Sequence, residues 1–294
     1  MTDLGRQGPK VLALHAHPDD VEFTCAGTLA LLVQRGCSLV IATLSPGDLG
    51  STEMGPRAIA GMRRREAQRS ASILGAPYAC LEFHDFCIYV DDESNRRVTE
   101  FLRGVRPDVV FVPSPQDYMA DHENTSALVR NACFYASVPN YTTRPESSAA
   151  AAAEHVPALY YCDPVGGKDI LGRPVEPTVL VDISKTIDQK SEMLACHESQ
   201  REWLHRQHGM DQYVEEMRAW SAERGRRIGC EFAEGFRQHL GHAFPAEDVL
   251  GGLLGSLVHH LEERPEKGKK APSMLTKDRH AANSHGPSLG EPVV

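Results

Sequence analysis

The sequence VLALHAHPDD at residues 11–20 contains the feature that decides the fold. Four apolar residues run directly into a loop that holds two histidines and two aspartates. A short apolar run bounded by turn residues is typical of a buried strand. Further runs rich in Val, Ile, Leu and aromatic residues predict strands in the same way, at residues 38–44, 79–83, 108–113 and 178–183.

Segments with helical spacing of apolar residues separate most of these runs, at residues 22–35, 56–74, 94–103 and 122–136. Alternating strands and helices imply crossover connections, and therefore parallel strands. We predict an α/β fold with a Rossmann-like, mostly parallel sheet that carries helices on both faces. Ligands of such folds bind beyond the carboxyl ends of the strands, so the loops after the strands are where we expect the site.

The chain divides into three parts by pattern. Residues 1–200 hold the strand and helix alternation and are predicted to form the α/β catalytic domain. Residues 201–263 are helical in pattern and rich in charge, and we expect a helical C-terminal extension packed on that domain. Residues 264–294 turn to Lys, Pro, Ser, Gly and Asn, which predicts a disordered tail. Residues 142–154 are interpreted as a surface connection or a short helix.

Composition excludes several classes of protein. The formal net charge of -9 argues against a nucleic-acid partner, because such proteins neutralise phosphates with clustered Lys and Arg. The longest apolar runs, such as residues 109–112, are far below the ~20 residues of a membrane span. The first ten residues lack a secretory signal pattern. The eight cysteines contain no Cys-x-x-Cys pair, which favours reduced thiols and a cytoplasmic location.

The loop after the first predicted strand carries candidate metal ligands. His17 and Asp20 are three residues apart and can face one ion, while Asp19 points elsewhere. Two protein ligands hold an ion weakly, so a third is expected from another loop after a strand. His122, at the end of residues 114–122, offers it, and a His, Asp, His set with an open position is typical of catalytic zinc. Helix capping is the alternative for each aspartate alone, including Asp121.

At this point the sequence resembles the PIG-L/LmbE family of zinc-dependent de-N-acetylases. The strongest motif is AHPDD at residues 16–20, followed by GTL at 27–29 and SPGDLGS at 45–51. Weaker motifs occur in the family's order: Arg65-Glu66, Asp121-His122, VDI at 181–183 and HESQ at 197–200.

The resemblance implies that His17, Asp20 and His122 hold Zn²⁺ and that Asp19 is the general base for attack of a metal-bound water. It also implies an N-acetylated sugar or conjugate as the small-molecule substrate. The chain departs from the family at Met119, where members often have a histidine beside the oxyanion or leaving group. A thioether cannot replace that histidine.

Two residues of the same loop and one from a later segment are candidates to replace the missing histidine. Tyr118, Asp117 and the later His197 are those candidates, and Tyr118 and Asp121 join Asp19 in the predicted catalytic set. Packing with a tied hydroxyl is the alternative role of Tyr118.

The predicted substrate-binding residues are Asp48, Arg65, Asp117 and His197. A turn is the alternative for Asp48, because Gly-Asp is common turn chemistry. A solvated helix face is the alternative for Arg65, which follows two other arginines. His15 is interpreted as a buried core histidine.

The favoured function is removal of an N-acetyl group from an amino-sugar-like molecule. An amidase acting on a thiol conjugate remains open, and so do a metal-dependent hydratase and a non-catalytic α/β binding module. The binding module has little support, since the first predicted strand is not followed by Gly-x-Gly-x-x-Gly. The pattern leaves homo-oligomer formation open.

Overall fold

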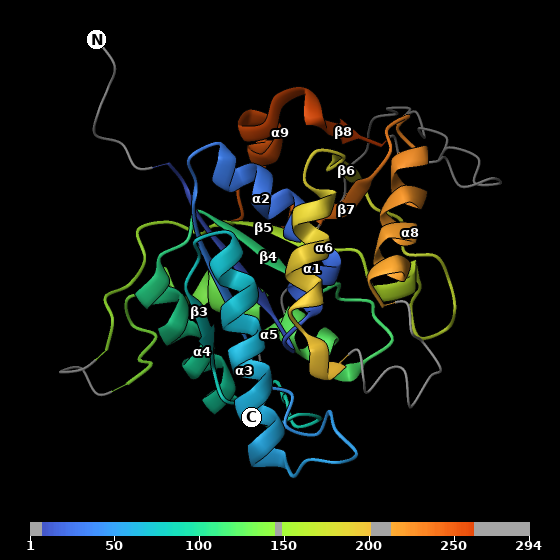
Figure 1. The fold of residues 1–294 in the computed structure, drawn as a ribbon. Helices are drawn as coiled ribbons and strands as arrows, with labels where there is room; N and C mark the ends of the chain where they lie inside the picture. The colour runs from blue at the N-terminus through green and yellow to red at the C-terminus, as the bar shows by residue number, and fades with distance from the viewer. Residues whose placement is uncertain (1–7, 145–148, 201–212, 262–294) are drawn as a thin grey trace, which may run out of the picture. The chain divides into compact units, whose positions relative to one another are not determined.

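The computed structural model describes residues 8–144, 149–200 and 213–261. An eight-stranded sheet has the strand order β3-β2-β1-β4-β5-β7-β6-β8 (Figure 1). The strands are β1 (Lys10–His15), β2 (Ser38–Thr43), β3 (Tyr78–Cys80), β4 (Val109–Val112), β5 (Ala158–Cys162), β6 (Val179–Asp182), β7 (Ala233–Gln238) and β8 (Val258–His260).

The first five strands pair in parallel, and this confirms the predicted sheet type. Strand β7 is antiparallel to both β5 and β6, and β8 is antiparallel to β6. The helices are α1 (Asp20–Thr24), α2 (Ala26–Gln34), α3 (Pro56–Ile73), α4 (Asp92–Val105), α5 (Ala120–Tyr135), α6 (Ile187–Ala195), α8 (Tyr213–Arg226) and α9 (Val249–Leu254).

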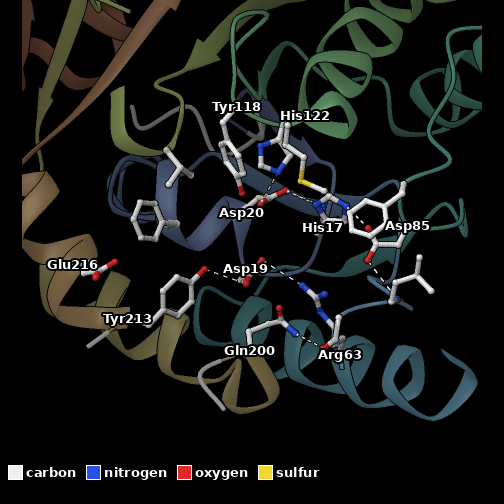
Figure 2. A pocket seen from close by; sticks show the side chains of 16 residues that line it. His17, Asp19, Asp20, Arg63, Asp85, Tyr118, His122, Gln200, Tyr213 and Glu216 are labelled. Atoms are coloured by element: carbon white, nitrogen blue, oxygen red, sulfur yellow. Dashed lines mark hydrogen bonds and ion pairs between the residues drawn. The ribbon is translucent and has the colours of Figure 1, made fainter. Parts of the chain in front are cut away.

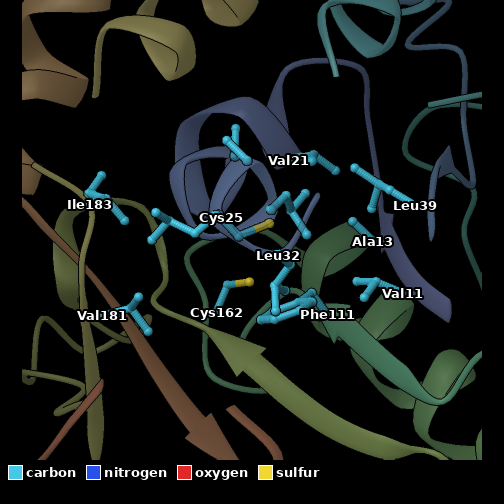
Figure 3. Close-up of a cluster of buried hydrophobic side chains, with 14 of the residues drawn as sticks. Val11, Ala13, Val21, Cys25, Leu32, Leu39, Phe111, Cys162, Val181 and Ile183 are labelled. Carbon is cyan, nitrogen blue, oxygen red and sulfur yellow. The ribbon is translucent and has the colours of Figure 1, made fainter. Parts of the chain in front are cut away.

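Both faces of the sheet are buried, because alternate side chains of each central strand enter different cores. Val11 and Ala13 of β1 belong to one cluster, and Leu12 and Leu14 belong to the other. The first cluster takes side chains from α1, α2, α3, α6, α8 and α9, and the second takes them from α4 and α5. Figure 3 shows part of the first cluster, with Val21 of α1 and Leu32 of α2 beside strand residues such as Val11 and Phe111. Continuous apolar strands are expected where helices cover both faces of a parallel sheet.

The order in which successive strands are added to the sheet changes direction between β1 and β4. The chain runs outward through β1, β2 and β3, then returns to place β4 on the other side of β1. The register pairs Val11 with Val109 and Ala13 with Phe111, so both strands end at the same sheet edge. The loops after β1 and β4 therefore meet at a topological switch point, the usual ligand site of this architecture.

The later part of the chain differs from the predicted helical extension. It contains α8 and α9, but β7 and β8 lie in the same segment and extend the sheet. Strand β5 also lies outside the predicted strands. Contacts group the described residues up to 261 into one unit. The predicted tail at 264–294 lies outside the described residues, and around 145–148 the described part of the 142–154 connection is not helical.

Among the described segments, none of the helices combines the length and apolar character that a bilayer crossing requires.

Candidate active site

The turn between β1 and α1 has a strained backbone at Asp19. Its φ of 99° is in the left-handed region, which residues with a side chain rarely adopt. The Asp20 carboxylate closes the turn by accepting a 2.8 Å hydrogen bond from the backbone N–H of His17. Asp19 lies at the N-cap position of α1, but its side chain makes no capping hydrogen bond. The capping alternative for Asp19 is therefore wrong, and such strain is common at functional sites.

His17, Asp20 and His122 meet at the carboxyl ends of β1 and β4 (Figure 2). One potential ligand atom from each residue lies within 4.8 Å of the other two. Asp20 Oδ2 is 3.6 Å from His17 Nδ1, and Asp20 Oδ1 is 3.4 Å from His122 Nε2. His122 comes from the first turn of α5, so residues about a hundred positions apart converge as the sequence predicts.

The far nitrogen of each imidazole contacts a carboxylate. His122 Nδ1 is 2.9 Å from Asp117 Oδ1, and His17 Nε2 is 3.2 Å from Asp121 Oδ2. Asp85 Oδ1 is 2.9 Å from His17 Nε2, a contact without hydrogen-bond geometry. Carboxylates in these positions favour protons on the far nitrogens, so a bound cation would face Nδ1 of His17 and Nε2 of His122, the nitrogens beside Asp20.

Charge in this cluster is unbalanced in favour of carboxylates. Burial alone would lower the pKa of His17, but the hydrogen bond with Asp121 and the neighbouring carboxylates of Asp20 and Asp85 raise it well above the usual value. Burial also opposes protonation of His122, and the charge of Asp20 with the hydrogen bond to Asp117 raises its pKa to about 10. The carboxylates of the cluster therefore favour positive charge at the buried His17 and His122.

This donor set fits a divalent cation. Two imidazoles and one carboxylate, each with a nitrogen or oxygen directed to a common point, are the usual protein ligands of a catalytic metal. The carboxylates behind the rings that stabilise protons on both imidazoles would equally stabilise a dication in front of them. His17, Asp20 and His122 are the residues that would hold it.

Asp19 lies next to these residues and has two polar neighbours. The Tyr213 hydroxyl donates a 3.0 Å hydrogen bond to Asp19 Oδ2, and Arg63 Nη2 is 3.5 Å from Asp19 Oδ1. Burial raises the pKa of Asp19 to about 6, although the charge of Arg63 lowers it and that of Asp20 raises it further. A carboxyl group with a pKa near neutrality can both accept and return a proton.

The SPGDLGS motif holds Arg63 in place. Arg63 donates hydrogen bonds to Gly47 O at 3.3 Å and to Pro18 O at 2.7 Å. Gly47 has a φ of 68°, and a Cβ there or at Gly50 would overlap the Arg63 guanidinium. A Cβ at either position would displace the guanidinium that reaches Asp19, and the positive φ of Gly47 is a further reason for glycine there.

A cavity of about 400 Å³ opens over the cluster. Its described lining includes His17, Asp19, Asp20 and His122, together with Arg63, Asp85, Gln200, Tyr213 and Glu216. Apolar and aromatic side chains form much of the remaining wall: Phe23, Leu49, Phe86, Tyr118, Met119 and Val165. A largely apolar pocket with a few converging polar groups is typical of a small-molecule site.

The predicted catalytic residues have different positions. Tyr118 lines the cavity and packs edge-to-face on the His122 ring, with the centroids 5.4 Å apart. Tyr118 is largely exposed, but partial desolvation of its hydroxyl and the charges of Asp20 and Asp117 raise its pKa, so the hydroxyl stays protonated at neutral pH. Asp121 lies behind His17 and accepts a 2.7 Å hydrogen bond from the backbone N–H of Phe86. It makes no capping hydrogen bond for α5, so that alternative is wrong for Asp121 too.

The predicted substrate-binding residues lie away from the described cavity lining. Asp48 accepts a 2.9 Å hydrogen bond from the backbone N–H of Asp85, which makes it a loop residue. Arg65 is exposed on α3, because the helix directs Arg63 inward instead. The Asp117 carboxylate contacts Nδ1 of His122. His197 is buried beside Glu22, with Nε2 and Oε1 3.2 Å apart.

Arg63, Asp85 and Tyr213 are among the lining residues that were absent from the predicted site. Helical phase could have found Arg63, since it lies on the face of α3 that buries Ile59, Glu66 and Ser70. Asp85 could have been found because it belongs to a His-Asp pair in the loop after β3, and polar residues in loops after strands are candidate site residues in this fold. Tyr213 has no comparable signal, because it reaches the site from a distant helix.

Comparison with known proteins gives a consistent result. Residues 12–133 match the model of the PIG-L family, described as GlcNAc-PI de-N-acetylase. A diacetylchitobiose deacetylase from Thermococcus kodakarensis is 29% identical over 199 residues, which cover 65% of this chain and 70% of that protein. A 4-oxalmesaconate hydratase from Pseudomonas putida is 26% identical over 193 residues, covering 63% and 71%.

A solved structure shares the fold. N,N'-diacetylchitobiose deacetylase from Pyrococcus horikoshii superimposes with a TM-score of 0.68 at 24% identity, over 82% of this chain and 88% of that one.

Proposed function

Because residues 12–133 belong to the PIG-L family, we propose that this chain is a metal-dependent amide hydrolase that removes the N-acetyl group of an amino-sugar-like molecule. The observation that carries the proposal is the convergence of His17, Asp20 and His122 beside a buried Asp19, at the floor of a cavity. Similarity to a diacetylchitobiose deacetylase supports the same reaction class.

We assign Zn²⁺ as the ion, since two nitrogen donors and one carboxylate with an open position suit it. When bound, such an ion makes water more acidic and the amide carbonyl more electrophilic. His17 and His122 would hold it through Nδ1 and Nε2, the nitrogens that face Asp20. Asp121 and Asp117 keep the opposite nitrogens protonated and fix the direction of each ring.

Asp19 is the proposed general base. It lines the cavity next to Asp20, and the Tyr213 hydroxyl and Arg63 hold its two oxygens in a fixed direction. Asp19 accepts a proton from the water that attacks the acetyl carbonyl. It then returns that proton to the amine that leaves, because an amine must be protonated to depart at neutral pH.

Tyr118 is the proposed replacement for the family histidine, whose position is occupied by Met119 in this chain. Its ring is supported by His122, and Figure 2 shows its hydroxyl directed toward Asp20. A protonated hydroxyl at this position can donate a hydrogen bond to the carbonyl oxygen as that oxygen gains negative charge. Asp117 and His197 are less suited, since one contacts His122 and the other lies beside Glu22.

The lining favours a substrate without a carboxylate near the scissile bond. Asp19, Asp20, Asp85 and Glu216 line the cavity, whereas Arg63 is the one guanidinium among its described lining residues. Arg63 already contacts Pro18 O and Asp19. An uncharged N-acetylated sugar avoids repulsion by these carboxylates. An N-acyl thiol conjugate also meets this condition and stays the alternative within the same chemistry.

A metal-dependent hydratase is the second candidate, because a 4-oxalmesaconate hydratase is among the relatives. The acid and base requirements differ between the two reactions. Amide hydrolysis needs one group that takes a proton and later delivers it to nitrogen, and Asp19, held in the cavity by Tyr213 and Arg63, is placed for both steps. This favours the hydrolase.

The test is a substrate screen on protein stripped with chelator and reloaded with Zn²⁺. We expect free amine and acetate from N-acetylglucosamine or diacetylchitobiose, and loss of both products after chelation. N-acetylated thiol conjugates test the alternative amidase, and loss of alkene absorbance from unsaturated acids tests the hydratase. Hydration without any amide hydrolysis would overturn the proposal.

A further inference from the structure

A second group of metal-binding side chains lies inside the core, apart from the cavity. His15, Cys25 and Cys162 come from the end of β1, the junction of α1 with α2, and the end of β5. One nitrogen of His15 and both Sγ atoms lie within 4.8 Å of one another. His15 is 1% exposed and each cysteine is 0% exposed (Figure 3 shows the two cysteines).

Hydrogen bonding leaves this group incompletely satisfied. His15 Nε2 is 3.1 Å from the Thr24 hydroxyl, which itself donates to Asp20 O at 2.7 Å. His15 Nδ1 is buried without a hydrogen-bond partner. The surrounding cluster is apolar and includes Val11, Leu32 and Phe111. A polar atom in such surroundings is costly unless something binds it.

The donors differ in kind from those of the active site. Thiolates and an imidazole prefer thiophilic ions such as Zn²⁺ and Cu⁺, whereas the cavity offers nitrogen and carboxylate donors. Burial raises the pKa of Cys25 well above its usual value, whereas the nearby Cys25 and His15 lower the pKa of Cys162 against the effect of burial.

We propose that His15, Cys25 and Cys162 form a second metal site, which binds a thiophilic ion of the Zn²⁺ or Cu⁺ class independently of the active site. The site has a structural role. The bound ion would connect β1, the junction of α1 with α2, and β5. These elements lie next to the turn that carries His17 and Asp20. The Thr24 hydroxyl links the second site to this turn, because it contacts His15 Nε2 and donates to Asp20 O. The ion enters before the core closes, so loading requires folding in its presence.

The test uses Co²⁺ as a spectroscopic probe in the full chain, refolded with the metal. Thiolate ligation gives an intense near-ultraviolet charge-transfer band, which the active-site donors cannot produce because they contain no sulfur. We expect this band in the wild type and its loss in Cys25→Ser and Cys162→Ser. It should persist in Cys133→Ser, whose thiol is buried in the other core cluster, and in His122→Ala.

Metal counting gives a second readout that does not depend on the folding of the cysteine variants. Wild type refolded with Zn²⁺ should hold two ions, and His122→Ala should keep the one bound by thiolates. Absence of a cobalt–thiolate band in the folded wild type would overturn the proposal, whatever the outcome for hydrolysis. A Cys25–Cys162 disulfide in unreduced, metal-loaded protein would also overturn it.

Discussion

The Tyr213 hydroxyl donates a 3.0 Å hydrogen bond to Asp19 Oδ2, which connects α8 to the turn after β1. The Tyr213 ring also stacks on Phe23, with centroids 5.7 Å apart, so the ring stays in place without the hydroxyl. Removal of the hydroxyl therefore tests its polar role alone.

We expect Tyr213→Phe to reduce kcat about ten- to hundredfold, because a hydrogen bond to a charged group is worth about 1.5–3 kcal/mol. KM should change little if the hydroxyl orients Asp19 and does not hold substrate. Tyr141→Phe, a half-buried tyrosine packed near Arg96, is the matched control. Unchanged kcat in Tyr213→Phe would remove this residue from the site.

Arg63 and Arg65 provide a matched pair on one helix. Arg63 is buried and makes forked contacts with Gly47 O, Pro18 O and Asp19, whereas Arg65 is exposed. Lysine cannot reproduce the planar fork. Arg63→Lys should lower kcat about 10²-fold by displacing Asp19, and Arg65→Lys should keep wild-type rates. Equal losses in the two variants would contradict this account of α3.

Asp117 is expected to act through His122. Asp117→Asn removes the carboxylate 2.9 Å from His122 Nδ1, and loss of such a partner typically weakens metal binding about 10–100-fold. Competition with a chelating dye measures Zn²⁺ affinity directly. Asp92→Asn, at the exposed start of α4, is the control. An unaltered affinity with a raised KM would instead return Asp117 to a substrate-binding role.

Asp19→Asn separates chemistry from metal binding. Asparagine fits the same space but cannot carry the proton, so product formation should fall at least about 10²-fold. Zn²⁺ content should equal that of the wild type, since Asp19 is not one of the three ligands. Near-native turnover in this variant would show that another group is the base.

The sequence was sufficient to predict the central strands and the convergence of His17, Asp20 and His122, because both depend on local patterns. Residues 11–20 combine a buried strand with a polar loop, and parallel pairing brings β4 and its loop to the same edge. Loop residues that follow strands are predictable for this reason. Strand β5 is a short apolar run in a region dominated by an alanine-rich connection, which obscured its boundaries.

Other features depend on packing that local patterns do not encode. Strand β7, with the sequence AEGFRQ, resembles its charged helical surroundings, and its extended form comes from pairing with β5 and β6. The buried pair of Lys190 and Glu234, 2.6 Å apart, likewise joins α6 to β7 across the core. Asp48 matched a family motif, yet loop geometry directs its carboxylate to the Asp85 backbone.

The most direct test of the central claim is anomalous diffraction at the zinc absorption edge from crystals of the Zn²⁺-loaded chain. The account predicts a strong peak bounded by Nδ1 of His17, the Asp20 carboxylate and Nε2 of His122, with Asp19 beside it. An active, zinc-dependent enzyme whose crystals show no peak between these three residues would contradict it.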